Sequence, residues 1–234
     1  GILLDLIATD AFQRLRNIRQ LALSSLVYPG AVHSRFNHCI GAFHLTTQAL
    51  ASLRNKGVII SPDEYEATQI AILLHDIGHG PFSHALESVI LHGLHHERMS
   101  KAIMYHLDQQ FDGRLDLAIA IFVGKYNRKF LHQLVSSQLD MDRMDYLKRD
   151  SYFTGVVEGL VSASRIIKTL SVIDDRIVVE SKGIYSVEKF IVARRLMYWQ
   201  VYLHRAVLAA GYMIVHILRR AKELMYEGHN LWKN

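Results

Sequence analysis

The chain has few cysteines and prolines, and each scarcity excludes a class of structure. Its 234 residues contain one cysteine, Cys39, so neither a disulfide framework nor a cysteine-based zinc site is available. A single cysteine also agrees with a reducing compartment. Only three prolines occur, and long stretches rich in Leu, Ile and Ala lie between them. The scarcity of helix breakers predicts a mostly α protein.

The sequence also lacks a long hydrophobic run. The most apolar late stretch, residues 206–218, is too short to span a bilayer and contains His216, so we interpret it as a buried helix without membrane contact. No basic and apolar leader opens the chain, so we expect a cytoplasmic protein. Because the chain starts at Gly1 without a methionine, we also expect truncation at one or both ends.

No strong excess of one charge is present either. The net charge is +5, from 27 Lys and Arg against 22 Asp and Glu. The basic residues are scattered or paired with acids, which favours an ordinary solvated surface. A phosphate-rich ligand is the main alternative, and nucleic acid, including single strands, comes next. Half of the residues are hydrophobic, enough to bury the core of one large domain.

Hydrophobic spacing and turn residues predict the order of the helices. Ser61, followed by Pro62 and two acids, is a strong helix-start signal, and its helix is predicted to end at Gly78–Gly80. Pro81 then begins another short helix. The further helices are predicted over residues 1–26, 35–55, 95–110, 114–123, 128–150 and 187–226.

Residues 174–186 differ from the helical stretches. Residues 177–179 and 184–185, separated by Lys182–Gly183, predict a short β-hairpin. No repeat, low-complexity tract or linker divides the chain, which predicts one domain. Its predicted parts are a helical core over 1–170, a hairpin over 171–186 and a long helix over 187–234.

Residues 71–87, AILLHDIGHGPFSHALE, crowd five metal-binding or proton-transferring side chains directly after an apolar run. His75 and Asp76 are adjacent at a helix end, and His79 lies one turn further on the same face. Mixed imidazole and carboxylate ligands suit metals that act on phosphates. An adjacent His–Asp pair alone is common, so the assignment depends on candidates elsewhere in the chain.

Two distant segments supply those candidates. His38 lies near the start of a predicted helix, with Arg35 just before it, and residues 138–150 form an acidic stretch that contains Asp142 and Asp145. On its own, the acidic stretch is typical of a solvated helix face with ion pairs between neighbouring turns. The residues alone therefore leave open whether this acidic stretch contributes metal ligands or forms a solvated helix face.

Six segments in order resemble the HD-domain metal-dependent phosphohydrolases, whose ligand pattern is H…HD…D. The segments are FQRLRNIRQL (12–21), YPGAVHSRFNHCIG (28–41), LLHDIGHGPFSH (73–84), HHE (95–97), DMDRMDYLKRD (140–150) and ARRLMYWQVYLHRA (193–206). Within that family the chain is most similar to the deoxynucleoside triphosphate triphosphohydrolase branch, which includes dGTPase-like enzymes and the SAM-and-HD-domain dNTPase. The resemblance implies an HD-domain helical bundle.

The resemblance also implies a metal centre with proton-transfer partners. His84 and Glu87 match a His–acid pair beside the phosphates, in which Glu87 orients His84 as a proton donor. His79 and His96 match further imidazoles that face the phosphate chain, although a merely exposed histidine is the alternative for His96. One divalent ion (Mn, Fe, Mg, Ni or Zn) would be held by His38, His75, Asp76 and Asp142.

Substrate and regulatory residues follow from the same resemblance. Arginines would hold the triphosphate because a guanidinium donates two hydrogen bonds to one phosphate, and the family often has Lys where this chain has Arg143. The residues implied for the phosphates are Arg35, Arg143 and Arg194, and those for the sugar and base are Gln20, Tyr146, Asp150 and Tyr202. A core aromatic is the alternative for Tyr202.

Some relatives bind an activating nucleotide at a subunit interface, and Gln13 and Arg16 match part of that site. Ala8 stands where an acid that reads guanine is expected, which argues against guanine-specific activation and leaves another nucleotide as the activator. The resemblance further implies a homo-oligomer, either a dimer or a tetramer.

The leading hypothesis is a hydrolase that converts a deoxynucleoside triphosphate to deoxynucleoside and inorganic triphosphate. A second hypothesis is another HD phosphohydrolase, acting on a nucleoside monophosphate, an alarmone or a cyclic dinucleotide; the arginine and tyrosine segments argue against it. A third is a nucleotide sensor or nucleic-acid-binding protein, which four competent ligand positions argue against. A zinc protease is excluded because no second histidine follows His96 four residues later.

Overall fold

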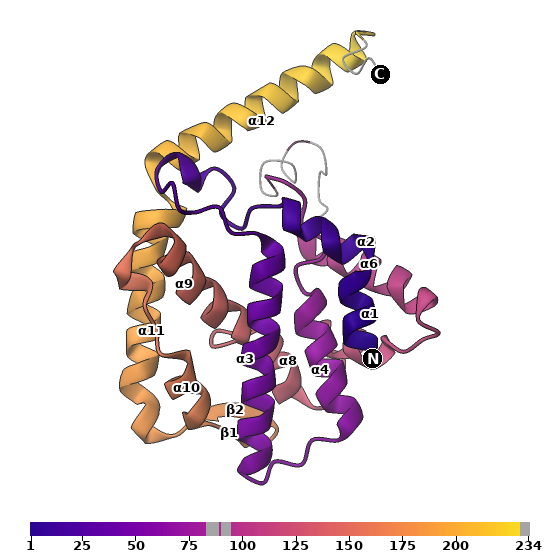
Figure 1. Ribbon diagram of the computed structural model, residues 1–234, viewed down its shortest axis with the longest axis vertical. Helices are drawn as coiled ribbons and strands as arrows, with labels where there is room; N and C mark the ends of the chain where they lie inside the picture. Colours follow the sequence, from indigo (N-terminus) through magenta and orange to yellow (C-terminus); the bar gives the residue numbers. More distant parts are fainter. Residues whose placement is uncertain (83–88, 90–94, 230–234) are drawn as a thin grey trace.

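A computed structural model of the chain describes residues 1–82, 89 and 95–229. Helices predominate and one antiparallel hairpin accompanies them (Figure 1), so the predicted mostly α fold is confirmed. The strands are β1 (Leu170–Ile173) and β2 (Arg176–Val179). The α-helices are α1 (Ile2–Ala8), α2 (Asp10–Gln13), α3 (Arg35–Asn55), α4 (Pro62–Leu74), α6 (His96–Gln110), α7 (Asp116–Phe122), α8 (Lys129–Val135), α9 (Met141–Thr154), α10 (Ala163–Thr169), α11 (Ile184–Met197) and α12 (Arg205–Tyr226).

The two central helices, α3 and α4, begin at reciprocal caps. The Ser61 side chain accepts a hydrogen bond from Glu64 N, and the Glu64 carboxylate accepts one from Ser61 N, with Pro62 in the first turn. Ser34 and Asn37 make the same exchange at the start of α3. These caps confirm both predicted helix starts, and His38 lies in the turn that follows the Ser34 cap.

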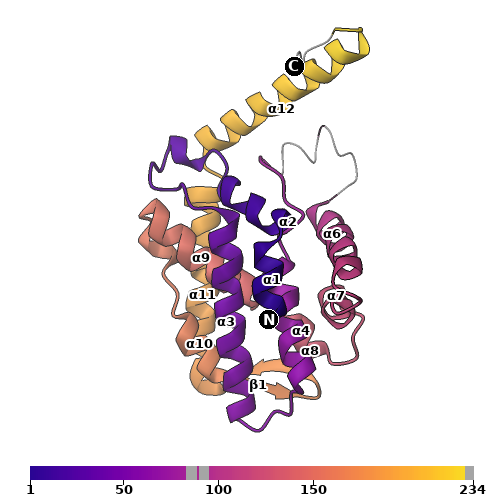
Figure 2. The ribbon, with the colours of Figure 1, turned by 45° about the vertical axis from the view of Figure 1, so that its right-hand side comes forward.

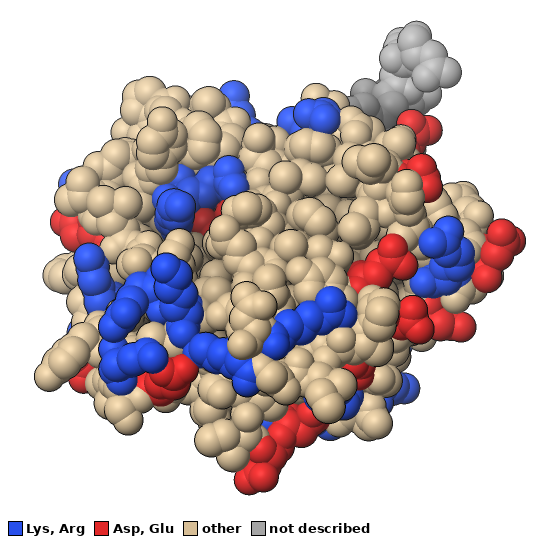
Figure 3. All heavy atoms as spheres, turned by 60° about the horizontal axis from the view of Figure 1, so that its bottom comes forward, with Lys and Arg blue, Asp and Glu red and all other residues tan. Residues whose placement is uncertain are grey.

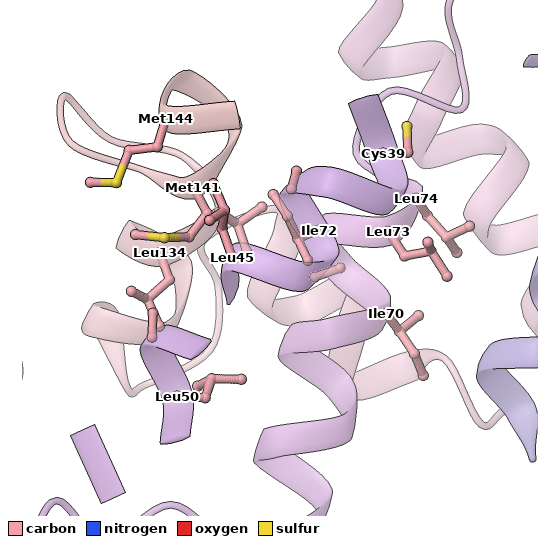
Figure 4. Close-up of a cluster of buried hydrophobic side chains, with 14 of the residues drawn as sticks. Cys39, Leu45, Leu50, Ile70, Ile72, Leu73, Leu74, Leu134, Met141 and Met144 are labelled. Atoms are coloured by element: carbon pink, nitrogen blue, oxygen red, sulfur yellow. The ribbon is translucent and has the colours of Figure 1, made fainter. Parts of the chain in front are cut away.

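The central part of the core lies where α3, α4, α8 and α9 meet (Figure 4). Leu45, Leu50, Ile72, Leu134 and Met144 are almost completely buried there, and each such side chain contributes about 1.5 to 3 kcal/mol on burial. Every residue of α4 from Ala67 to Leu74 is buried. The residues that follow this helix, His75 and Asp76, therefore lie inside the protein rather than on its surface.

Two predicted helices are wrong because each is interrupted. The predicted helix over 1–26 is α1, α2 and two 3₁₀ turns, at Arg14–Asn17 and Ser24–Leu26. The predicted helix over 128–150 is α8 and α9, separated at residues 136–140. Asp140 begins α9 because its carboxylate accepts a hydrogen bond from Arg143 N at 2.7 Å. This break brings Asp142, in the first turn of α9, close to His38 and His75.

The hairpin exists, but its predicted turn is wrong. The turn is Asp174–Asp175, with φ of 49° and 59°, and Ile173 pairs with Arg176. Aspartate tolerates this left-handed conformation, so the pair can form a two-residue turn without glycine. Ile184, which we expected in the second strand, begins α11 instead.

The predicted single helix over 187–226 is also wrong. After α11, residues Tyr198–Tyr202 form a π-helical turn, and α12 extends away from the helical body (Figures 1 and 2). Within the described residues no lone helix has the length and apolar character to cross a membrane, whereas the bent pair Ser181–Tyr202 and Arg205–Tyr226, at 57°, passes that test when the two are combined.

The hairpin end of the molecule carries a mixed charged surface. Figure 3 views this end, where Lys and Arg side chains form a band with Asp and Glu side chains beside it. Near the hairpin, Lys56 pairs with Glu180, and Arg128 Nε lies 3.2 Å from Asp175 Oδ1. Basic residues here are thus partly paired with acids, as the sequence analysis expected.

Candidate metal centre

Four predicted ligands converge at one point between α3, α4 and α9. His38 Nε2 lies 3.2 Å from His75 Nε2 and 3.0 Å from Asp142 Oδ1. His75 Nε2 lies 3.5 Å from Asp142 Oδ1 and 3.6 Å from Asp76 Oδ1. His38 contributes from the first turn of α3, His75 and Asp76 from the end of α4, and Asp142 from the first turn of α9. The packing of the three helices thus brings together residues that are far apart in the sequence.

Both imidazole rings are held with Nε2 toward the convergence point. His75 Nδ1 donates to the Ile72 carbonyl oxygen at 2.6 Å, which fixes the orientation of the ring. His38 Nδ1 lies 2.8 Å from Asp145 Oδ2, and Arg149 donates two hydrogen bonds to the same carboxylate. A partner on Nδ1 that orients the ring is the usual arrangement around a metal-binding histidine.

The electrostatics of the centre are those of a cation site. Burial lowers the pKa of His38, but Asp142 and Asp145 outweigh it and raise that pKa to about 10. Burial alone would raise the pKa of Asp142, yet hydrogen bonds from His38 and His75 hold it below its ordinary value. The carboxylates therefore attract positive charge to this point, and a metal ion replaces protons when it binds such ligands.

The spacing of the donors fits a divalent ion. Ligand atoms about 2.1 Å from an ion and at right angles to each other lie about 3 Å apart. The His38, His75 and Asp76 donor atoms lie within 4.8 Å of one another, and Asp142 adds a fourth within 3.5 Å of both imidazoles. Two neutral imidazoles with two carboxylates suit Mn, Fe, Ni, Zn or Mg, so the residues present fit the predicted cofactor.

A cavity of about 430 Å³ reaches the centre from the side of α6 and α8. Its walls include His75, Asp76 and Asp142, so water and phosphate oxygens can approach the convergence point. Arg98, Lys101 and His132 also line it; these cationic or imidazole residues were not singled out from the sequence. The cavity therefore combines an acidic ligand wall with basic groups suited to an anion.

Two further predicted imidazoles lie next to the ligands. His79 Nε2 is 3.2 Å from Asp76 Oδ1, and its ring stacks on His96 with 4.0 Å between centroids. Burial lowers the pKa of His79 to about 4 despite Asp76, so its ring is neutral at neutral pH. Arg14, which sequence reasoning missed, donates to the His79 carbonyl oxygen at 2.8 Å and fixes this segment.

Close contact between the backbones of α6 and the segment after α4 brings His96 next to His79. A Cβ on Gly78 would lie 2.2 Å from Ser100 N and 2.4 Å from the His96 carbonyl oxygen. Only glycine permits the first turn of α6 to approach the end of α4 so closely. Ser100 Oγ also donates to the His75 carbonyl oxygen at 2.7 Å, which joins α6 to the metal-binding segment.

The three predicted phosphate-binding arginines differ in their surroundings. Arg35 is buried and donates to Asp76 Oδ2 at 2.5 Å, while its Nε has no hydrogen-bond partner among the described residues. Arg143 Nε donates to the Ser137 carbonyl oxygen at 2.7 Å. Arg194 donates to Gln138 Oε1 at 3.1 Å. Arg143 and Arg194 both contact the loop between α8 and α9, which brings α11 close to the start of α9.

The residues predicted for the sugar and base form a second group. Tyr202 OH donates to Asp150 Oδ2 at 2.8 Å, and the Tyr146 and Tyr202 ring centroids lie 6.0 Å apart. Tyr146 in turn lies beside His38, with 6.5 Å between centroids. Gln20 Oε1 is buried and has no hydrogen-bond partner among the residues that the structure describes. Aromatic rings thus lead from the metal centre toward Asp150.

The remaining predicted residues are placed as follows. Gln13 donates to the Ile7 carbonyl oxygen at 2.7 Å, Arg16 Nε donates to Gln13 Oε1 at 2.6 Å, and the Arg16 guanidinium lies 3.6 Å from the Phe36 ring centroid. This pair is on the N-terminal segment and contacts the first turn of α3 through Phe36. His84 and Glu87 lie outside the described residues.

Comparison with known proteins gives the family. A model of the HD domain matches residues 35–150, and one of the HD associated region matches residues 161–231. This chain belongs to the HD-domain phosphohydrolase family. All four converging ligands lie inside the first matched region, so the family predicted from the sequence is confirmed.

The chain is also similar to individual proteins. It is 39% identical to the uncharacterized protein YwfO of Bacillus subtilis, over 96% of this chain and 53% of that protein. It is 33% identical to the deoxynucleoside triphosphate triphosphohydrolase SAMHD1 homolog of Dictyostelium discoideum, over 95% of this chain and 47% of that protein. The chain therefore spans about half the length of these curated relatives.

A crystal structure shows the same fold. A phosphohydrolase from Bacteroides thetaiotaomicron superposes with a TM-score of 0.97 and 55% sequence identity. The match covers 100% of this chain and 59% of that chain. The helical arrangement described above is therefore that of an HD-domain phosphohydrolase.

Proposed function

We propose that this chain forms the catalytic domain of a metal-dependent hydrolase that converts deoxynucleoside triphosphates to deoxynucleoside and inorganic triphosphate. The observation that carries the proposal is the convergence of His38, His75, Asp76 and Asp142 on one point in a cavity wall. Tyr146, Tyr202 and Asp150 lie beside it and offer the aromatic and polar groups that a nucleoside would need. The relative from Dictyostelium that bears this activity in its name supports the choice of substrate.

His38, His75, Asp76 and Asp142 would hold the ion. When bound, a divalent cation would supply a Lewis acid for a phosphate oxygen and lower the pKa of a water molecule. Asp145 and Ile72 keep the two imidazoles oriented for this purpose. Arg35 orients Asp76, and its unpartnered Nε remains able to donate to a phosphate oxygen.

The proposed reaction breaks the bond between the α-phosphorus and the 5′-oxygen of the sugar. Water oxygen adds to the α-phosphorus and leaves with the triphosphate, while the 5′-oxygen takes a proton and leaves as the nucleoside hydroxyl. Arg143 and Arg194 would stabilise the negative charge that develops on the phosphates. The proton donor predicted from the sequence is His84, oriented by Glu87, and His79 with His96 would face the phosphate chain.

The test is product analysis in water labelled with oxygen-18. The chain is incubated with each of the four dNTPs, with GTP and with ATP, singly and in mixtures, in Mn²⁺ or Mg²⁺. We expect deoxynucleoside and intact triphosphate, with the label in the triphosphate and none in the nucleoside. Asp142→Ala is the inactive control.

Other products would contradict the proposal. Release of orthophosphate or pyrophosphate, or hydrolysis of monophosphates alone, would instead indicate another phosphohydrolase activity. Nucleotide binding without hydrolysis in any mixture would favour the sensor hypothesis.

The homo-oligomer and the activating nucleotide are part of the same proposal. Arg16 and Gln13 lie together on the N-terminal segment, where a second nucleotide could meet a guanidinium and an amide. Hydrolysis that requires a second nucleotide, together with a nucleotide-dependent change of mass in solution, would support both. Equal rates with single nucleotides and in mixtures would contradict the activator.

A further inference from the structure

His33 is a buried histidine that belongs neither to the metal ligands nor to the residues predicted from the sequence. It lies in the loop before α3 and is 4% exposed. Its ring stacks on Phe153 of α9, with centroids 4.5 Å apart and planes at 19°. The ring is therefore held in one orientation by packing as well as by its hydrogen bond to Asp150.

His33 joins three segments that carry candidate sugar-binding residues. Its Nε2 lies 2.7 Å from Asp150 Oδ1, and Tyr202 OH occupies the other oxygen of that carboxylate. The His33 carbonyl oxygen accepts a hydrogen bond from Gln20 N at 3.0 Å. The N-terminal segment, α9 and the π-helical turn after α11 are thus linked through one histidine and one carboxylate.

The polar groups in this assembly are not all used by the chain. Asp150 is 1% exposed, and an ionised carboxylate only accepts hydrogen bonds, so His33 Nε2 and Tyr202 OH are its donors. His33 Nδ1 and Gln20 Oε1 are buried and have no hydrogen-bond partner within the described part of the chain. Buried polar atoms are rarely left unpaired, so these two indicate a partner beyond the described residues, such as water or a bound ligand.

We propose that His33 is a positioning residue that holds Asp150 ready to accept the 3′-hydroxyl of a deoxynucleotide. The inference rests on the proposed function, because it assigns a role within the sugar site of that reaction. With the His33 donor in place, the Asp150 carboxylate is fixed at both oxygens and retains lone pairs for a hydroxyl. Without it, only Tyr202 restrains the carboxylate, and recognition of the hydroxyl weakens.

Three replacements of His33 separate the hydrogen bond from the bulk of the ring. In His33→Gln the amide nitrogen reaches about as far as Nε2 and can still donate to Asp150. In His33→Asn the amide ends near the position of Nδ1 and cannot. His33→Phe keeps the stack on Phe153 and removes the donor. Tyr152→Phe changes an exposed neighbour on α9 and is the matched control.

The measurement compares a dNTP with its 2′,3′-dideoxy analogue, which lacks the 3′-hydroxyl. Loss of a hydrogen bond to a charged group predicts that His33→Asn and His33→Phe raise KM for the dNTP roughly 10- to 100-fold. The ratio of kcat/KM between the two substrates should fall by a similar factor, while kcat changes little. His33→Gln and Tyr152→Phe should keep the wild-type ratio.

A double-mutant cycle and a measurement of metal affinity test whether the role of His33 is merely structural. Asp150→Asn should abolish the preference for the 3′-hydroxyl, and adding His33→Phe should then change the ratio no further. Affinity for Mn²⁺ should be the same in wild type, His33→Asn and His33→Gln. Equal loss of activity toward both substrates, or a preference that survives in His33→Asn and His33→Phe, overturns the inference.

The outcome for the wild type distinguishes the two proposals. If it hydrolyses no nucleotide but binds dNTPs, calorimetric affinities for the dNTP and its dideoxy analogue replace the kinetic ratio. If it neither hydrolyses nor binds them, the proposed function and this inference fail together. If it prefers the 3′-hydroxyl and the His33 variants do so equally, this inference alone fails.

Discussion

His38 and His75 present their Nε2 atoms to each other at 3.2 Å, while the opposite nitrogen of each ring is bound to Asp145 or to the Ile72 carbonyl. Both Nε2 atoms are therefore directed at the same point, where a proton lies when no metal is bound, because Asp142 and Asp145 raise the pKa of His38 to about 10. The surrounding contacts therefore maintain an arrangement whose natural occupant is a metal ion.

Metal binding should stabilise the fold through these ligands. At a Mn²⁺ concentration 100 times its Kd, we expect about 2.7 kcal/mol of added stability, or roughly 5 to 10 °C in Tm. Asp142→Ala should abolish the shift, whereas Asp5→Asn, an exposed acid on α1, should retain it. Thermal unfolding with Mn²⁺ and with a chelator measures this. An equal shift in Asp142→Ala would contradict the assignment of that ligand.

Asp145 should control metal affinity without touching the ion. Asp145→Asn keeps the shape and an acceptor for His38 Nδ1 but removes the charge that makes the ring a better ligand. We expect metal affinity to fall by about 10- to 100-fold. Titration of Mn²⁺ by calorimetry would show it, with Asp174→Asn in the exposed hairpin turn as control. Unchanged affinity would mean that Asp145 only supports packing.

Gly41 on α3 should tolerate no side chain. A Cβ there would lie 2.0 Å from both Asp145 Oδ1 and Arg149 Nη2, so Gly41→Ala must displace the carboxylate that orients His38. We expect a loss of about 1 to 3 kcal/mol in unfolding free energy, together with weaker metal binding.

Gly211→Ala is the matched control for that change. A Cβ at this position of α12 meets nothing within 4 Å, so helix propensity predicts a gain of up to about 1 kcal/mol. Chemical denaturation of both variants tests the pair. Equal effects at the two positions would contradict the close contact at Gly41.

Stability in acid should depend on Glu64. Burial raises its pKa, but hydrogen bonds from Ser61 N, Tyr126 OH and Arg128 outweigh this and lower it below its ordinary value of 4.5. The stabilisation is therefore complete above about pH 4.5 and is lost as the pH falls through the lower folded value. Glu64→Gln should lose about 1 kcal/mol at pH 7 and unfold with a shallower dependence on pH below 4.5.

Thermal unfolding from pH 3 to 7 checks this prediction. Glu66→Gln, a change of another acid on the same helix, serves as the control. Parallel pH profiles for wild type and Glu64→Gln would contradict the role of Glu64.

The sequence predicted those features that depend on neighbouring residues. The Ser61 and Ser34 caps depend on a side chain three residues away, so their helix starts were correct. The break after Met197 was missed because residues 198–204 contain neither proline nor glycine. Tyr28 OH bonds to the Gln200 carbonyl oxygen at 2.6 Å, a long-range contact that no local pattern reveals.

In the site, too, the residues that belong to a sequence motif were predicted, and those that act through distant contacts were not. The H…HD…D pattern predicted the four metal-binding residues, and the structure brings these side chains together. Arg14, Arg149 and His33 were missed because each acts on a residue distant in space or one turn away, with no motif of its own. For Asp145 there was a signal, an acid one turn after Asp142, but only its bond to His38 shows what it does.

At the π-helical turn Tyr198–Tyr202, the number of residues determines the direction that the following chain takes. Such a turn accommodates one residue more than an α-helical turn does, and each residue of an α-helix rotates the chain by about 100°. Deleting one residue here would restore a regular helix, swing Tyr202 off Asp150 and send α12 in a new direction. Single-residue insertions and deletions in this segment would therefore change both the proposed sugar site at Asp150 and the path of the terminal helix.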